Sequence, residues 1–341
     1  MFSLKSAPIH LWLYNHPCSR ISDQISFFLM ALKQHGYEVS VGRRPRETSL
    51  NVVIENFSPH TRDVLLEFCR ASKKRVAVIM TEHIDFEHGQ IFFHGSPLGS
   101  RNDYMHPHTM VARTTHLLEC LPHIRCFFVL GDLPELRNFT NLLPGLNIRH
   151  IPFPRLQEIP FGKLDQPEHV KSDVAFTGLM TELRFEIIDT LKKGKLLVNC
   201  PQIFVSRKRR DALNRSSKLI LNIPQREGWR WLSLMRIVAG LQVGRATISL
   251  GTQDTSRISS CCTQLDLQKE QWISELQQSV TDWKVLYLRD IENYSLMAKA
   301  FEEEHPFPHD VLEYWRITDR VNYCCPKSEC PRVDSTGKLL K

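Results

Sequence analysis

The sequence has no long apolar run and no leader-like N-terminus. Its longest apolar stretches, Val76 to Met80 and Phe127 to Leu130, are far shorter than the roughly 18–20 residues that cross a bilayer. Pro8, His10 and Asn15 interrupt the first apolar stretch, so the chain lacks the continuous hydrophobic segment of a signal peptide. We therefore expect no transmembrane segment and a cytoplasmic location.

The sequence also lacks the motifs of several common enzyme classes. It has neither the Walker lysine motif of P-loop nucleotidases nor the GxGxxG turn of dinucleotide-binding folds. It has no GxSxG nucleophile elbow, no HExxH pair and no DxD-type carboxylate pair. An α/β enzyme with a Cys or Ser nucleophile is therefore the least favoured of the functions considered.

Cysteine and histidine are frequent, but not at metal-ligand spacing. Four of the ten cysteines lie in apolar stretches and are expected as small buried side chains: Cys69, Cys120, Cys126 and Cys200. Three cluster near the C-terminus: Cys324, Cys325 and Cys330. A closed zinc site needs about four ligands at recurrent spacing, and neither this cluster nor the seven histidines between His83 and His123 provides it. We expect no metal site.

Short apolar strands alternate with amphipathic helical stretches along the whole chain. This alternation is typical of α/β units around a parallel sheet. Residues 152–172 interrupt it with several prolines, so we expect a domain boundary there. The expected parts are an N-terminal domain over 1–155, a C-terminal domain over 172–320 and a polar tail over 321–341. Helices are predicted over 133–141 and 229–243, and a strand over 285–288.

Positive charge is concentrated in one part of the chain. The formal net charge is +7, and residues 207–236 contain nine Lys and Arg against two acidic residues. Such a stretch can bind a nucleic acid, an acidic membrane surface or a phosphorylated small molecule, or it can simply form solvated helix faces.

The segment 172–262 carries the most informative pattern. Phe176-Thr177-Gly178 follows a predicted strand, Arg184 lies in the next helix, and Arg236 precedes Gly244 by eight positions. These residues resemble the nucleotide-binding C-terminal half of GT-B glycosyltransferases, in particular the spore-maturation-protein-like transferases of the family 1/4 type. That family has a glutamate three positions after the arginine, to hydrogen-bond the ribose hydroxyls, whereas this chain has Ala239.

The resemblance implies two tandem Rossmann-like domains with a cleft between them, followed by a helical C-terminal segment. It implies transfer of a sugar, of hexosyltransferase type, from a UDP- or GDP-sugar to an acceptor hydroxyl, without a metal or another cofactor. Arginine suits this chemistry because its planar guanidinium can bind phosphate oxygens. The expected donor-binding residues are Thr177, Gly178, Arg207, Asn222, Arg230, Arg236, Thr252 and Thr255.

An inverting transferase also needs a base near the acceptor hydroxyl. Glu82, His83 and Asp85 follow a predicted strand, at the edge of the sheet where ligands bind, and are the predicted catalytic residues. His16 and Asp23 are alternatives. A retaining enzyme would need no such base.

Two alternative functions remain beside a transferase acting on a glycan, small molecule or protein. A phage-type DNA base glycosyltransferase would use the basic stretch to contact the phosphate backbone. A degenerate GT-B protein would bind its ligand without turnover, and Ala239 is the residue that favours it.

Overall fold

Six apolar segments of the N-terminal half form one parallel sheet in the order β2-β1-β3-β4-β8-β9. The inner strands are buried along their whole length, which explains their continuous Val and Ile content. The strands are β1 (Ile9–Trp12), β2 (Val39–Gly42), β3 (Leu50–Ile54), β4 (Val76–Ile79), β8 (Ile124–Leu130) and β9 (Ile148–Ile151).

Helices pack on this sheet, and a small antiparallel sheet extends from it. The helices are η1 (Cys18–Ile21), α1 (Ser22–Gln34), α2 (Pro59–Ser72), α3 (Pro107–Glu119), η2 (Leu121–His123) and α4 (Phe139–Leu142). Ser58 caps α2 by accepting a hydrogen bond from the Thr61 amide, with Pro59 in the first turn. The small sheet consists of β5 (Ile84–Glu87), β6 (Gln90–Phe93) and β7 (Ser96–Pro97).

The C-terminal half forms a second parallel sheet in the order β11-β10-β12-β13-β14. Its strands are β10 (Ser172–Ala175), β11 (Val198–Asn199), β12 (Ser217–Asn222), β13 (Thr247–Leu250) and β14 (Thr263–Leu265). Its helices are α6 (Glu182–Lys193), α7 (Arg207–Arg215), α8 (Leu234–Gln242), η3 (Arg257–Cys261) and α9 (Trp272–Thr281). In each sheet the first strand lies between the second and the third, which makes a switch point where ligands commonly bind.

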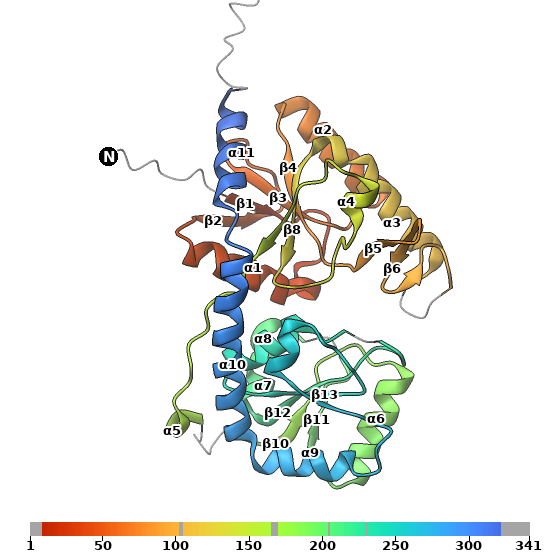
Figure 1. Cartoon of the computed structure of the whole chain (residues 1–341), viewed down its shortest axis with the longest axis vertical. Coiled ribbons are helices and arrows are strands. Elements are labelled where there is room, and N and C mark those ends of the chain that lie inside the picture. The colour runs from red at the N-terminus through yellow and green to blue at the C-terminus, as the bar shows by residue number, and fades with distance from the viewer. Residues whose placement is uncertain (1–8, 102–104, 165–169, 204, 230, 322–341) are drawn as a thin grey trace, which may run out of the picture.

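The computed structural model describes residues 9–101, 105–164, 170–203, 205–229 and 231–321. The two sheets belong to two domains placed end to end (Figure 1), which confirms the expected tandem Rossmann-like architecture. The predicted tail and its three cysteines lie outside the described residues. None of the described helices is long and apolar enough to cross a membrane.

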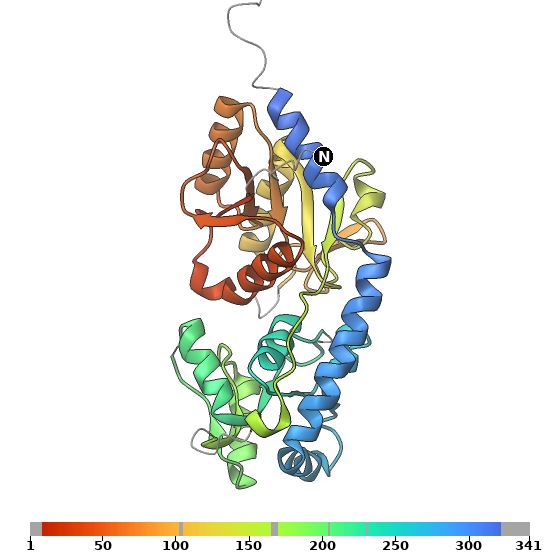
Figure 2. The ribbon, with the colours of Figure 1, turned by 90° about the vertical axis from the view of Figure 1, so that its left-hand side faces the viewer.

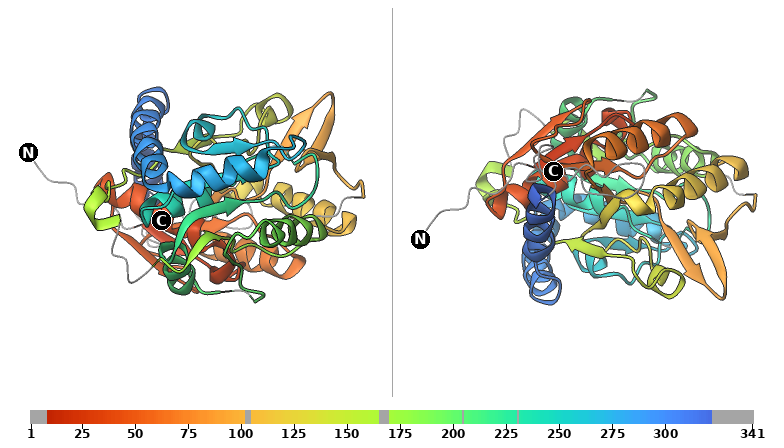
Figure 3. Two further views of the ribbon diagram at one scale, coloured as in Figure 1. Left: turned by 90° about the horizontal axis from the view of Figure 1, so that it is seen from below. Right: turned by 90° about the horizontal axis from the view of Figure 1, so that it is seen from above.

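The chain passes between the domains twice, as Figure 2 shows. The first passage contains α5 (Phe161–Leu164), and the second is α10 (Trp283–Glu304), followed by α11 (His309–Val321) beside the N-terminal sheet. Arg125 of β8 donates a hydrogen bond to Thr318 of α11. The predicted domain limits stay a prediction, and the structure adds that α11 packs on the N-terminal domain. Seen along the long axis, α10 and the β5–β6 hairpin lie on opposite flanks (Figure 3).

Three local predictions were wrong. Residues 285–288 are helical within α10 rather than a strand, because Tyr287, Ile291 and Tyr294 recur at helical spacing and are buried. The helix predicted over 133–141 is shorter and later in the chain, as α4 (Phe139–Leu142), and among the described residues of 229–243 the helix is limited to α8 (Leu234–Gln242). The residues before each of these two helices form loops that contribute to the cleft described below.

Gly131, at the carboxyl end of β8, lies where three parts of the chain meet. Its φ is +61°, and a Cβ there would be 2.8 Å from the Phe153 ring and 3.2 Å from Leu234 of the C-terminal domain. A side chain at this position would meet both backbone strain and overpacking.

Gly131→Ala is therefore expected to lower the free energy of unfolding by about 2–4 kcal/mol. Gly145→Ala is the matched control, because its Cβ would meet nothing within 4 Å and its φ is not positive. Urea denaturation of both variants measures the difference, and equal stabilities would contradict the close approach at Gly131.

Candidate functional site

A cleft of about 460 Å³ lies between the two domains. Its N-terminal wall is formed by loops after β4 and β8, and its C-terminal wall by loops after β12 and β13 together with the start of α8. These are carboxyl ends of parallel strands, where open α/β sheets bind ligands. The volume is within the range of roughly 300–1,000 Å³ usual for small-molecule sites.

Two arginines dominate the C-terminal wall. Arg184 of α6 and Arg236 of α8 both line the cleft, and their guanidinium carbons lie 5.1 and 5.3 Å from the centre of the Phe176 ring. Gly178 leaves room for that ring, since a Cβ there would be 2.5 Å from it. Thr177 and Gly178, which were expected to bind the donor, are not among the described residues that line the cleft. Gly178 instead provides space for the Phe176 ring, which both arginines contact.

Each arginine has a different set of hydrogen bonds. Arg184 donates to the backbone carbonyls of Leu179, Ile223 and Pro224 at 2.6 to 3.1 Å, which fixes the loop after β12. Arg236 donates one hydrogen bond through Nη1 to Oδ1 of Asn222, at 2.7 Å. Nε and Nη2 of Arg236 have no hydrogen-bond partner among the described residues.

Neither guanidinium forms an ion pair with a carboxylate in the described part of the chain. Burial, and secondly the charge of Arg236, lower the pKa of Arg184 to about 9. Burial likewise lowers the pKa of Arg236 to about 10. Asp23 exerts a favourable charge on Arg236, but its carboxylate is already bound by Arg210 at 2.7 and 2.5 Å. Two partly desolvated cations without a counter-ion form a site that an anion would stabilise.

Among the described residues, five titratable side chains lie on the N-terminal wall: His83, His94, Asp132, Glu135 and Arg137. His83 packs edge-on against Trp231, with ring centres 4.3 Å apart. Asp132 accepts a hydrogen bond from the Arg257 amide at 2.8 Å. Burial raises the pKa of Asp132 and of Glu135, the latter well above its usual value.

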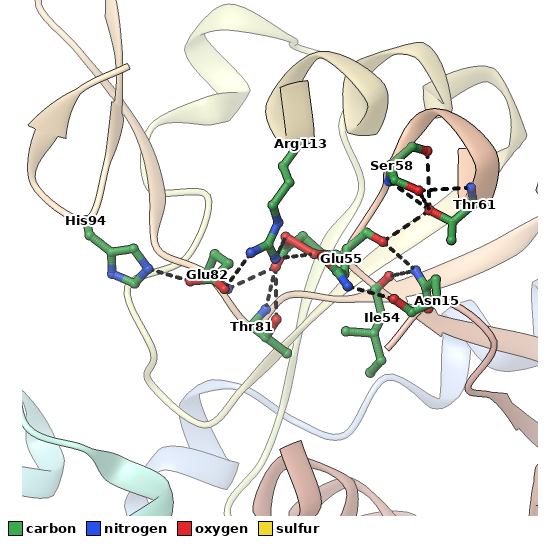
Figure 4. A network of polar contacts seen from close by, with 10 residues as sticks. Asn15, Ile54, Glu55, Ser58, Thr61, Thr81, Glu82, His94 and Arg113 are labelled. Carbon is green, nitrogen blue, oxygen red and sulfur yellow. Dashed lines mark hydrogen bonds and ion pairs between the residues drawn. The ribbon is translucent and has the colours of Figure 1, made fainter. Parts of the chain in front are cut away.

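Glu82 is part of a buried network next to the cleft and does not line it (Figure 4). Arg113 of α3 donates to Glu82 at 2.8 Å and to Glu55 at 2.6 Å. The other oxygen of Glu82 bonds with His94 at 2.6 Å, and Glu55 accepts hydrogen bonds from the Thr81 and Glu82 amides. This network fixes the loop after β4 and thereby the position of His83.

Asp85 lies in the small antiparallel sheet, outside the cleft lining. Burial raises its pKa to about 6, and it accepts a hydrogen bond from the Phe86 amide. Of the three predicted catalytic residues, only His83 therefore borders the cleft.

The predicted donor-binding residues are similarly divided. Asn222, Arg236 and Thr255 line the cleft. Thr252 is buried against Ser249 behind the cleft wall. Arg207 hydrogen-bonds Gln242 at 3.4 Å and does not line the cleft, and Arg230 lies outside the described residues.

The basic stretch does not act as one group. Arg210 pairs with Asp23 of the other domain, Arg207 lies 3.7 Å from Asp211, and Lys218 pairs with Asp173. Arg236 is in the cleft. Much of the positive charge of 207–236 is thus used in internal contacts, and binding to DNA stays a prediction.

The loop after β12 links the two walls. Trp229 stacks on His94 with ring centres 4.9 Å apart, and Arg226 donates to the His94 carbonyl at 3.1 Å. Gly95 leaves space for Trp231, whose ring a Cβ would approach to 2.9 Å. These contacts cross from the C-terminal domain to the small sheet of the N-terminal domain.

Glu135 was not among the predicted site residues. It follows β8, which pairs with β4, so the carboxyl-end rule that selected His83 also applies to it. The interpretation of 133–141 as a helix concealed the loop that carries it. In the described residues no group of three or more His, Cys, Asp or Glu side chains could hold a metal ion.

No protein-family model and no curated protein matches the chain. Solved structures of GT-B glycosyltransferases do match over most of it. T4 phage BGT in complex with its UDP-glucose substrate is 9% identical, with a TM-score of 0.46, and covers 92% of this chain and 99% of its own. Sucrose-phosphate synthase from Thermosynechococcus elongatus is also 9% identical, with a TM-score of 0.46 and coverage of 94% and 100%.

An α1,3-fucosyltransferase is 11% identical, with a TM-score of 0.41 and coverage of 92% of each chain. At such identities the likeness concerns the fold. The function has to follow from the residues of the cleft.

Arg113→Met is expected to lower the free energy of unfolding by about 3–5 kcal/mol, because it leaves Glu55 and Glu82 buried without their shared cation. The loss should be smaller at pH 5 than at pH 8, since protonation removes the uncompensated charge. Chemical denaturation at both pH values measures it.

The matched control is Arg62→Met, which breaks an ion pair with Glu119 at the surface and should change stability little. Adding Glu82→Gln to Arg113→Met should recover part of the loss. Equal effects of the Arg113 and Arg62 variants would contradict the role of the buried network.

Proposed function

We propose that the protein is a glycosyltransferase that transfers a sugar from a nucleoside diphosphate sugar to an acceptor hydroxyl. The observation that carries this proposal is a pair of arginines, the buried Arg184 and the half-buried Arg236, which line the cleft between two Rossmann-like domains and form no ion pair with a carboxylate in the described part of the chain. A diphosphate is the anion whose charge and shape suit this pair.

Arg236 is the main diphosphate ligand in this proposal. Asn222 orients its guanidinium through Nη1, which leaves Nε and Nη2 as donors for phosphate oxygens. The start of α8 adds the positive end of the helix dipole next to Ser233. Negative charge grows on the diphosphate as the bond to the sugar breaks, and fixed donors stabilise that charge.

The nucleoside needs other contacts, because Ala239 offers no carboxylate. Gln253 and Thr255, in the loop after β13, line the same wall and carry polar groups that suit ribose hydroxyls. We assign to them the binding of the ribose hydroxyls, which in the similar GT-B transferases is the role of the glutamate. The acceptor then occupies the N-terminal wall, near His83 and Glu135.

UDP, GDP, CDP, ADP and dTDP provide the test, as a thermal-shift panel followed by calorimetry of any binder. At least one should raise the melting temperature, because a ligand at 100 times its Kd stabilises the folded state by about 2.7 kcal/mol. Arg236→Met should weaken this binding about 10- to 100-fold, the effect of losing charge-assisted hydrogen bonds.

Without ligand, Arg236→Met should melt no lower than the wild type, because the substitution removes repulsion on Arg184. Lys208→Met, an exposed change on α7, is the control and should bind like the wild type. A wild type that none of the five diphosphates stabilises would contradict the proposed function.

A further inference from the structure

Glu135 is a buried carboxyl group held rigidly at the cleft. The residue is 8% exposed, it lines the cleft, and its Oε2 atom has no hydrogen-bond partner among the described residues. The next residue, Leu136, donates a backbone hydrogen bond of 2.7 Å to Ile84, which ties the loop to the small sheet. A buried polar atom without a partner is costly, so its retention at a cleft wall points to a ligand.

The charges that shift the pKa of Glu135 are negative. Asp132 precedes it in the same loop, Glu82 follows the neighbouring strand β4, and Glu55 follows β3. Arg113 forms ion pairs with both Glu55 and Glu82. Together with burial these carboxylates raise the pKa of Glu135 well above its usual value. His83 and Arg137 border the same wall, and Arg184, Arg236 and Asp254 the opposite one.

A carboxyl group with a raised pKa is a stronger base when it is ionised, and it titrates closer to neutral pH. Two neighbours suit the role of a base less well. Asp132 also has an oxygen, Oδ1, without a hydrogen-bond partner among the described residues, but its Oδ2 accepts a hydrogen bond from the Arg257 amide of the C-terminal domain. The His83 ring packs against Trp231.

We propose, resting on the glycosyltransferase function above, that Glu135 is the general base for the acceptor and that the sugar is transferred with inversion. Glu135 lines the cleft from the N-terminal domain and the two arginines line it from the C-terminal domain, and in this proposal the acceptor beside Glu135 attacks from the side opposite the diphosphate. The acceptor oxygen forms its bond to the anomeric carbon while the bond from that carbon to the diphosphate oxygen breaks. The proton of the acceptor hydroxyl passes to the Glu135 carboxylate, and the nucleoside diphosphate leaves with the electron pair.

Water replaces the unknown acceptor in the test. The probe is the glucose conjugate of whichever diphosphate stabilises the wild type, for example UDP-glucose, and the readout is release of the nucleoside diphosphate. Glu135→Gln keeps the size and polarity of the side chain but cannot take a proton. It should lower the release rate by about 100-fold or more, with unchanged affinity for the diphosphate.

Glu87→Gln is the matched control, since Glu87 is a carboxylate of the same domain outside the cleft lining, and it should react like the wild type. The wild-type rate should rise with pH through an apparent pKa above the usual carboxyl range, and Glu135→Gln should lack this limb. Proton NMR of freshly released glucose, from an α-linked donor, should show the β anomer first.

Each other outcome overturns the proposal. Near-normal release by Glu135→Gln, an α anomer as first product, or a wild type that binds the diphosphate but hydrolyses none of its glucose conjugate would exclude Glu135 as this base. A wild type that binds no nucleoside diphosphate would instead contradict the proposed function itself, so the two failures are distinguishable.

Discussion

The account depends on two guanidinium groups that contact the same aromatic ring and form no ion pair in the part of the chain that the structure describes. Arg184 and Arg236 both contact Phe176. The same ring occupies the space that a side chain at position 178 would need, which requires glycine there. Arg184 also binds three carbonyls of the surrounding loops, so the positive charge is part of the local fold. A buried charge without a partner lowers the stability of the folded protein, and binding of an anion beside that charge recovers the lost stability.

The opposite wall has the reverse charge and is fixed in a different way. Arg113 holds Glu55 and Glu82 in one network, which positions the loop after β4 but also occupies both carboxylates. Glu135 interacts electrostatically with both carboxylates, and its Oε2 atom has no hydrogen-bond partner in the described part of the chain. The loop with Trp229 and the ion pair between Asp23 and Arg210 hold the two walls together. This arrangement suits the proposed reaction, because the arginines can bind the leaving diphosphate while the acidic wall accepts the proton of the acceptor.

Local sequence signals were sufficient for the fold and for part of the cleft. Helix and strand periodicity, with Ser58-Pro59 at a helix start, predicted two parallel sheets, and the carboxyl-end rule placed His83 at the cleft. The resemblance to GT-B glycosyltransferases pointed to Asn222 and Arg236, which also line it. Two features depend on contacts far apart in the chain. The burial of Tyr287 overrides strand propensity, and the network that engages Glu82 joins residues 12 and 31 positions apart. Glu135 was missed because its loop resembles the start of a helix.

The most direct test of the central claim is a crystal structure with the nucleoside diphosphate that binds most tightly. The account predicts phosphate oxygens within hydrogen-bond distance of Nε or Nη2 of Arg236, with the nucleoside toward Gln253 and Thr255. A diphosphate bound on the exposed face of α7, or elsewhere outside the cleft between the domains, would contradict it.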